Sequence, residues 1–88
     1  MKDSSYDEIK WCYQIIDHGT PEHPDYCVHE VYFDIKTRRI VTHTLNPVTL
    51  ENYETKEELI EVLEMIIEDL RKNKVITMND VDRDVFKK

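Results

Sequence analysis

The chain has few of the residues that would mark it as a linker, a disulfide-rich domain or a phosphate-binding protein. Its 88 residues include one glycine, three prolines and two cysteines. So few glycines and prolines exclude a linker-like or low-complexity protein, and a single glycine cannot build a glycine-rich phosphate loop. Hydrophobic residues make up 40% and charged residues 35% of the sequence. This balance indicates one globular domain with a modest core.

Long apolar runs and clustered basic residues are also missing. No apolar run is long enough to cross a bilayer, and the first ten residues are polar and acidic, unlike a signal peptide. We therefore expect a cytoplasmic protein that does not bind membranes and whose Cys12 and Cys27 stay as thiols. The only basic cluster is Lys36, Arg38 and Arg39. Three charges at a turn are too few to predict direct nucleic-acid binding.

Negative charge is concentrated in one segment. The formal net charge is -7. Residues 51–70 contain eight acids and one base, whereas all other residues together contain eleven of each and cancel. This one segment therefore sets the electrostatic character of the molecule.

Within this segment, the sequence pattern of residues 55–70 predicts one long amphipathic helix. Thr55 and Glu58 have the spacing of a capping box. Basic residues follow the segment, where they interact favourably with the helix dipole. Apolar residues recur at the helical period and form one broad stripe. The stripe consists of Leu59, Ile60, Val62, Leu63, Ile66, Ile67 and Leu70.

Three strands are predicted before this helix, at residues 11–16, 26–35 and 40–45. Their short connections favour antiparallel pairing. The expected fold class is α+β: a three-stranded antiparallel meander with one long amphipathic helix packed on one face, and a possible short fourth strand at residues 75–77.

The expected domain organisation has three parts. Residues 1–9 form a flexible N-terminus, residues 10–77 form a single α+β domain, and residues 78–88 form a C-terminal tail. The tail has the composition for a short helix in which Asn79 caps a last turn with Val81, Val85 and Phe86.

The alternation of side chains in the second strand predicts its core face. One face is more apolar and is expected to meet the core: Cys27, His29, Val31, Phe33 and Ile35. Folding back about the loop centre would place Ile15, Tyr13 and Trp11 opposite Cys27, His29 and Val31, so that all six share this face. The third strand leaves two alternatives for the inward set, Val41, His43 and Leu45 or Ile40, Thr42 and Thr44.

The acidic side of the predicted helix is the first candidate site. Glu57, Glu61, Glu64 and Glu68 follow one another at spacings of four, three and four, and we expect none of them to have a basic partner. Each like-charge pair costs roughly 0.2–0.5 kcal/mol, and an uncompensated cost indicates a surface for a cationic partner. Met65 lies on the same polar side and suits an adaptable interface. The alternatives are a solvated face that keeps the protein soluble and a lone surface methionine.

The sheet face away from the helix is the second candidate. Ile16, Tyr26, Val28 and Tyr32 are expected to lie together there. Tyrosine is enriched at interfaces, so this face would bind a partner or form a homodimer. The alternative is that the C-terminal segment, with Val81, Val85 and Phe86, covers it.

Catalytic and metal chemistry have weaker support. Residues suited to zinc occur at poor spacings, so a metal-binding protein is only an alternative function. They are Cys12, His18, His23, Cys27, His29 and His43. We predict no metal site, no cofactor and no catalytic residue, and we expect His29 to be a hydrogen-bonded core residue. A small-molecule enzyme would need a pocket lined by His29, Tyr13 and Tyr32.

Several motifs resemble a family of small uncharacterised bacterial proteins. The motifs are Trp11-x-Tyr13-x-Ile15-Ile16, His29-Glu30-Val31-Tyr32-Phe33-Asp34, Thr44-x-Asn46-Pro47 and the capped helix with residues 59–70. The resemblance covers most of residues 11–76 and implies a compact αβ domain with no known activity. His43 stands where that family has an aromatic residue. The order of elements alone is similar to HicB-type antitoxins, which have a partial RNase H-like fold and neutralise a small basic toxin.

These observations favour a non-enzymatic protein-interaction or regulatory module that binds a basic protein, with a homodimer as a further expectation. Electrostatic steering would make such binding sensitive to salt. A HicB-like antitoxin, or an inhibitor that imitates nucleic-acid charge, is an alternative of the same class.

Overall fold

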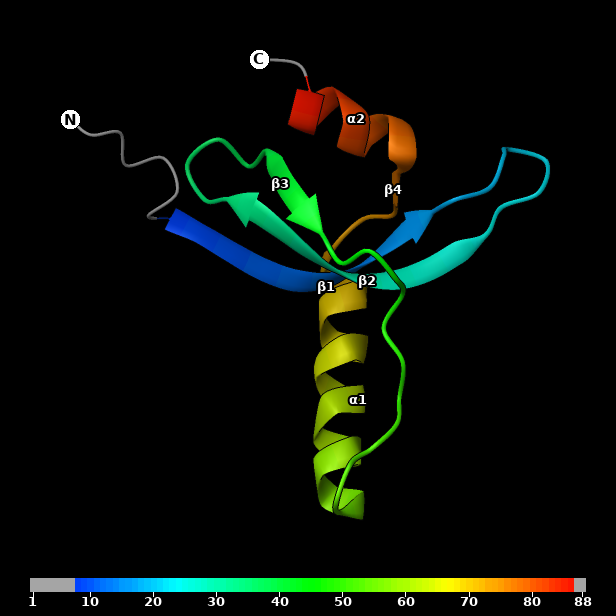
Figure 1. Cartoon of the computed structure of the whole chain (residues 1–88), viewed down its shortest axis with the longest axis vertical. Helices are drawn as coiled ribbons and strands as arrows, with labels where there is room; N and C mark the ends of the chain where they lie inside the picture. The colour runs from blue at the N-terminus through cyan, green and yellow to red at the C-terminus, as the bar shows by residue number, and fades with distance from the viewer. Residues whose placement is uncertain (1–7, 87–88) are drawn as a thin grey trace.

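A computed structural model of the chain describes residues 8–86 (Figure 1). In this range the strands are β1 (Ile9–Asp17), β2 (Tyr26–Asp34), β3 (Ile40–His43) and β4 (Ile76–Thr77), and the helices are α1 (Lys56–Lys72) and α2 (Met78–Phe86). The predicted α+β class is confirmed. The sheet has the order β3-β2-β1-β4, and β4 runs parallel to β1. The fold is therefore a mixed four-stranded sheet with two helices rather than a meander with one. Residues 1–7 of the predicted flexible N-terminus lie outside the described residues.

The register of β1 against β2 differs by one residue from the predicted one. Ile16, not Ile15, lies opposite Cys27. The loop between the strands fixes this register, because the Asp17 carboxylate accepts hydrogen bonds from the backbone N–H groups of Gly19 and Asp25 at 2.8 and 2.9 Å. A shift of one residue moves every side chain of a strand to the other face. The prediction that Ile15, Tyr13 and Trp11 share the core face is therefore wrong.

The core lies on the face of the sheet that α2 covers (Figure 1). We call this face, with Ile16, His29 and Val31, the α2 face. The core cluster consists of Ile16, Val31, Ile40, Ile76 and Val81, with the half-buried Met78 and Val85 packed against it. The prediction that His29 and Val31 of β2 point into the core is confirmed, since both are buried.

The start of α2 is set by a reciprocal cap. The Thr77 hydroxyl accepts the N–H of Asp80 at 3.1 Å, and the Asp80 carboxylate accepts the N–H of Thr77 at 3.0 Å. The cap is thus Thr77 and not Asn79 as predicted. It begins the helix immediately after β4, and this position brings Val81 into the core.

An irregularity in β3 answers the question of which side chains face inward. Ile40 lies opposite Phe33, and Thr42 lies opposite Tyr32, so β3 contains one extra residue. Such a bulge shifts the alternation of side chains. As a result Ile40 and His43 both face the α2 side. Each of the two sets predicted to face inward therefore contains one residue that does so.

The long helix α1 stands on the opposite face of the sheet and meets it mainly with its C-terminal end (Figure 1). The predicted helix and its Thr55 cap are confirmed, and the Thr55 hydroxyl accepts the N–H of Glu58 at 3.1 Å. Its predicted packing along a sheet face is wrong. The helix points away from the sheet, and Ile66 is the only apolar residue of α1 that is buried.

The contact between α1 and the sheet depends on the exposed edge of β1. Tyr13 pairs with Glu30 of β2 on one edge of β1, but β4 pairs only with the end of β1, so the other edge has no strand beside Tyr13. The Asp69 carboxylate accepts the N–H of Tyr13 at 3.0 Å, and the Asn73 amide donates to the carbonyl of Tyr13 at 3.4 Å. A side chain of α1 and the side chain of its C-cap residue Asn73 thus replace a neighbouring strand and fix the helix end on the sheet.

Candidate functional site

The predicted acidic residues lie on the exposed side of α1. We call Glu57, Glu61, Glu64, Met65 and Glu68 the acidic face, and all five are exposed. Of these glutamates, Glu68 forms an ion pair with Lys72 at 3.4 Å, which contradicts the expectation that none has a basic partner. Within residues 8–86 the structure has no ion pair to the other three. Most of the negative charge on this face is therefore uncompensated, and the exposed pair contributes little.

The predicted sheet surface lies on the same side of the sheet as α1, not away from it. Tyr26, Val28 and Tyr32 of β2 share this face with Trp11 of β1. Tyr26 is 61% exposed and Trp11 is 44% exposed. We call this face the α1 side of the sheet. The hydroxyl of Tyr32 donates to the Glu30 carboxylate at 2.8 Å.

The structure differs in two ways from the expected arrangement of this sheet face. Ile16 belongs to the core on the α2 face. Val81 of α2 also packs into that core, so the C-terminal segment covers the α2 face and not the α1 side. The register of β1 explains the position of Ile16. The C-terminal segment does cover the face away from α1, but the tyrosines of β2 lie on the other face, beside α1.

The helix α1 rises from the sheet face that carries the tyrosines and forms a corner with it (Figure 1). The loop of residues 44–55 runs beside α1 and adds exposed apolar side chains. Leu45 is 88% exposed, and Leu50 and Tyr53 are also exposed. Monomers rarely expose so many large apolar groups on one side. Sequence reasoning missed these loop residues because a loop has no periodicity that would predict exposure or burial.

A shallow depression of about 350 Å³ lies on α1 itself. Ile67 is the apolar residue among those that line it, and the others are Glu64, Glu68, Arg71 and Lys72. An apolar residue between charged side chains of both signs can accept an apolar side chain of another helix. It offers no set of convergent polar groups for a small molecule.

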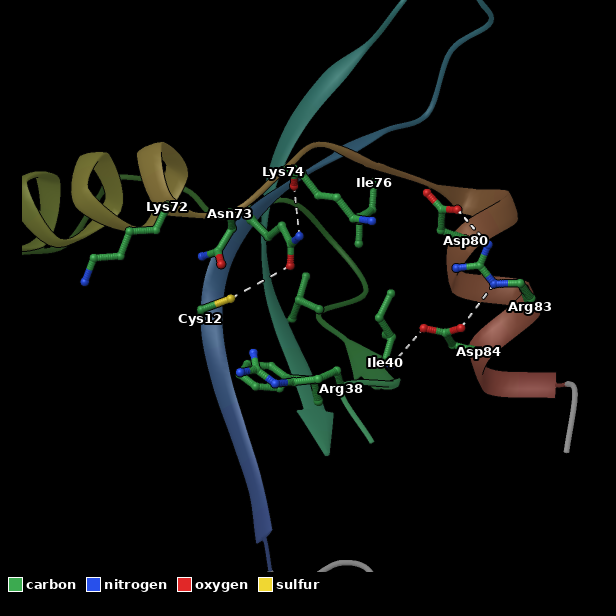
Figure 2. A pocket seen from close by; sticks show the side chains of 13 residues that line it. Cys12, Arg38, Ile40, Lys72, Asn73, Lys74, Ile76, Asp80, Arg83 and Asp84 are labelled. Atoms are coloured by element: carbon green, nitrogen blue, oxygen red, sulfur yellow. Dashed lines mark hydrogen bonds and ion pairs between the residues drawn. The ribbon is translucent and has the colours of Figure 1, made fainter. Parts of the chain in front are cut away.

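The larger hollow lies between β1, the end of α1 and α2 (Figure 2). Its volume is about 440 Å³. Arg83 pairs with Asp84 at 3.3 Å, Asp84 accepts the N–H of Ile40 at 3.1 Å, and Gln14 donates to the carbonyl of Lys74 at 2.8 Å. These polar groups bind one another and join the elements around the hollow. Their arrangement is typical of structural contacts rather than of a ligand site.

A histidine cluster lies between the loop after β1 and the end of β3, with the buried His29 at its centre. His29 is fully buried, its Nδ1 lies 3.0 Å from the carbonyl oxygen of Thr44, and its Nε2 lies 3.0 Å from Nε2 of His18. A carbonyl only accepts, so Nδ1 of His29 carries the proton and its Nε2 accepts from His18. The ring of His43 packs against His29 at a centroid distance of 5.3 Å. The predicted hydrogen-bonded core histidine is thus confirmed.

This cluster makes the stability of the protein sensitive to acid. Burial, together with the neighbouring His43 and His18, lowers the pKa of His29, although its hydrogen bond to Thr44 opposes this effect. Above pH of about 6.5 the residue is neutral in both the folded and the unfolded chain. Below this pH, His29 binds a proton in the unfolded chain but not in the folded chain. We therefore expect the free energy of unfolding to fall by up to about 1.4 kcal/mol per pH unit from this residue.

Chemical denaturation between pH 7.5 and pH 5 measures this effect. The variant His29→Gln cannot titrate at this position, so its free energy of unfolding should fall less steeply with pH than that of the original protein, whatever its absolute stability. Equal slopes for the two proteins would show that His29 does not carry the effect.

The other predicted chemical residues are separated. Within residues 8–86 no group of three or more histidine, cysteine or acidic side chains is arranged to hold a metal ion. Cys12 and Cys27 are free thiols. The pKa of each is raised, mainly because burial removes water from the thiol. The pocket that a small-molecule enzyme would need does not form from these residues, because Tyr13 and Tyr32 lie on the α1 side of the sheet and His29 lies on the α2 face.

Comparison with protein-family models, with curated proteins and with solved structures finds no match. The resemblance to the bacterial family and the similarity in layout to HicB-type antitoxins therefore stay predictions. In the described part of the chain, neither helix has the length and hydropathy to span a membrane.

Proposed function

We propose that this protein is a non-enzymatic interaction module that binds a basic protein through the acidic face of α1. The observation that carries the proposal is the position of this helix. The helix projects from the sheet, and its glutamates are exposed where another protein can approach them (Figure 1). A helix that only covered a sheet would be less accessible.

Charge supports the choice of a basic partner. The protein has a formal net charge of -7, and Glu57, Glu61 and Glu64 have no ion pair within residues 8–86. Like charges at this spacing destabilise an isolated helix. A cationic partner would remove that repulsion, and long-range attraction would raise the rate of association at low salt.

The acidic face also contains one apolar residue. Met65 lies among the glutamates and is 49% exposed. Methionine adapts its shape to different partners. A partner helix with lysines or arginines around one apolar side chain has the chemistry that this face would recognise.

Neutralising the acidic face tests the proposal. The variant Glu61→Gln, Glu64→Gln, Glu68→Gln tests binding to a lysine-rich helical peptide. Each ion pair lost between a glutamate and the peptide should reduce the binding free energy by about 0.5 kcal/mol, so the affinity should fall about tenfold. Fluorescence anisotropy of the labelled peptide measures this affinity, and the difference should shrink at high salt.

A matched variant separates the acidic face from net charge. Glu22→Gln, Glu51→Gln and Asp82→Asn remove the same number of charges at exposed positions outside α1. This control should bind the peptide within about twofold of the original protein. Equal losses for the two triple variants, or no loss for either, would contradict a specific acidic face.

A further inference from the structure

The apolar stripe of α1 is more exposed than is usual for a helix that packs only against its own chain. Ile60 is 42% exposed and Ile67 is 49% exposed, while Leu63 and Leu70 are half-buried. A surface helix normally buries such a stripe against its own core. Here the helix meets the sheet mainly at one end, so part of the stripe lacks a partner (Figure 1).

Four residues of the stripe, two exposed and two half-buried, have the spacing of a coiled coil. Ile60, Leu63, Ile67 and Leu70 follow at intervals of three, four and three. They place isoleucine at both a positions and leucine at both d positions of two successive heptads, which gives a continuous apolar seam for one partner helix. We call these four residues the α1 seam. Met65 lies outside it, on the acidic face.

We infer that a second copy of this chain covers the α1 seam, with the two copies of α1 packed side by side and antiparallel. The charges of the helix decide both the partner and the direction. The N-terminal half carries Glu57, Glu58, Glu61 and Glu64, whereas Arg71, Lys72 and Lys74 follow at the C-terminal end, and all seven are exposed. An antiparallel copy brings acidic against basic ends and opposes the helix dipoles, whereas a parallel copy brings like charges together.

A two-fold axis near the middle of α1 pairs the seam with itself. Ile60 then packs against the partner's Leu70, and Leu63 packs against the partner's Ile67, so each contact occurs twice. In the same alignment Glu57 lies beside the partner's Arg71 at two places, and Glu64 lies beside the partner's Glu64 once at the axis, so attractive contacts outnumber the repulsive one. Glu61 and Glu68 point away from the seam, and a dimer would still present both acidic faces to a basic protein.

The available apolar area fits a dimer of this kind. Large apolar side chains are exposed on the α1 side of the sheet, on the loop of residues 44–55 and on the seam, and they are Trp11, Tyr26, Leu45, Leu50, Tyr53, Ile60 and Ile67. At roughly 200 Å² for each fully exposed group, they expose on the order of 700 Å². A standard interface takes about 800 Å² from each partner. The antiparallel alignment brings the partner's helix N-terminus to the corner beside the sheet, where part of this area lies.

The oligomeric state of two matched variants tests the inference. Ile67 and Met65 are both 49% exposed on α1, so glutamate at either position should leave the folded protomer intact. Ile67→Glu places a charge in the seam and should raise the dissociation constant of the dimer at least about 100-fold, whereas Met65→Glu should change it less than about threefold. Sedimentation equilibrium measures both constants, and circular dichroism confirms that both variants are folded.

Every outcome decides the question. A monomeric original protein at about 100 μM, a dimer that survives Ile67→Glu, or equal loss of the dimer in Ile67→Glu and Met65→Glu would overturn the α1 seam as the interface.

A charge exchange tests the antiparallel direction. Glu57→Arg or Arg71→Glu alone should weaken the dimer, and the two together should restore it, because each pairs with the other in the partner. Failure of the double variant to restore the dimer would exclude this alignment. Binding of the lysine-rich peptide is read separately, so either proposal can fail without the other.

Discussion

Ile16→Ala is expected to lower the free energy of unfolding by about 3 kcal/mol, the largest effect that we expect from a single change in this protein. Ile16 is fully buried at the centre of the sheet. It lies opposite Cys27 of β2 on one side and Ile76 of β4 on the other, and it packs in the same cluster as Val81. Alanine would leave a cavity where β1, β4 and α2 meet. Urea unfolding measures the change.

The neighbouring residue provides a matched control. Ile15 lies one position away on the α1 side of the sheet and is only partly buried. Ile15→Ala should therefore cost about 1 kcal/mol, clearly less than Ile16→Ala. The comparison also tests the register of β1 against β2. A greater loss from Ile15→Ala than from Ile16→Ala would mean that the alternative register, with Ile15 on the core face, is the right one.

Asp69→Ala is expected to lower the free energy of unfolding by about 2 kcal/mol, the value for a hydrogen bond to a charged group. The Asp69 carboxylate accepts the N–H of Tyr13 on the open edge of β1. Without it this N–H, next to a buried side chain, has no acceptor. The end of α1 should then separate from the sheet more often. Hydrogen exchange of the Tyr13 amide should become faster, together with the loss of stability in urea unfolding.

Glu68→Ala is the control for this effect, since it removes an acid from the adjacent position of α1. Glu68 is exposed, and its pair with Lys72 is a surface ion pair. Its loss should cost less than about 0.5 kcal/mol and leave the exchange of the Tyr13 amide unchanged. Similar effects of the two variants would show that charge near the end of α1 matters, and not the hydrogen bond.

The same bond bears on both functional proposals. Asp69 and Asn73 hold α1 by its end, and this attachment leaves both the acidic face and the α1 seam open. A helix packed along the sheet would hide the seam and could not offer it to a second copy. The position of α1 is therefore the structural condition for dimerisation and for access of a basic partner.

Local features of the sequence were sufficient to predict several elements. Thr55 and Glu58 predicted the start of α1 because a cap depends on residues that are close in the chain. The alternation in β2 predicted that His29 and Val31 face the core. The exposed glutamates followed from helical spacing, although the ion pair of Glu68 with Lys72 was missed despite its spacing of four.

Features that depend on contacts between distant segments required the tertiary structure. Alternation shows which residues of a strand share a face, but the register decides which face that is, and here the hydrogen bonds of Asp17 in the loop shift it by one residue. For the same reason the sequence did not show that His18 and Thr44 would enclose His29.

The sequence by itself determined that this protein has a capped, acidic, amphipathic helix and three strands with one apolar face. Only the tertiary structure decided that α2 covers that face while α1 stands on the other side (Figure 1). The physical reason is that an apolar stripe specifies burial without specifying what buries it. Here α2 and β4 complete the core around Ile16, and the side chains of α1 meet an edge of the sheet instead.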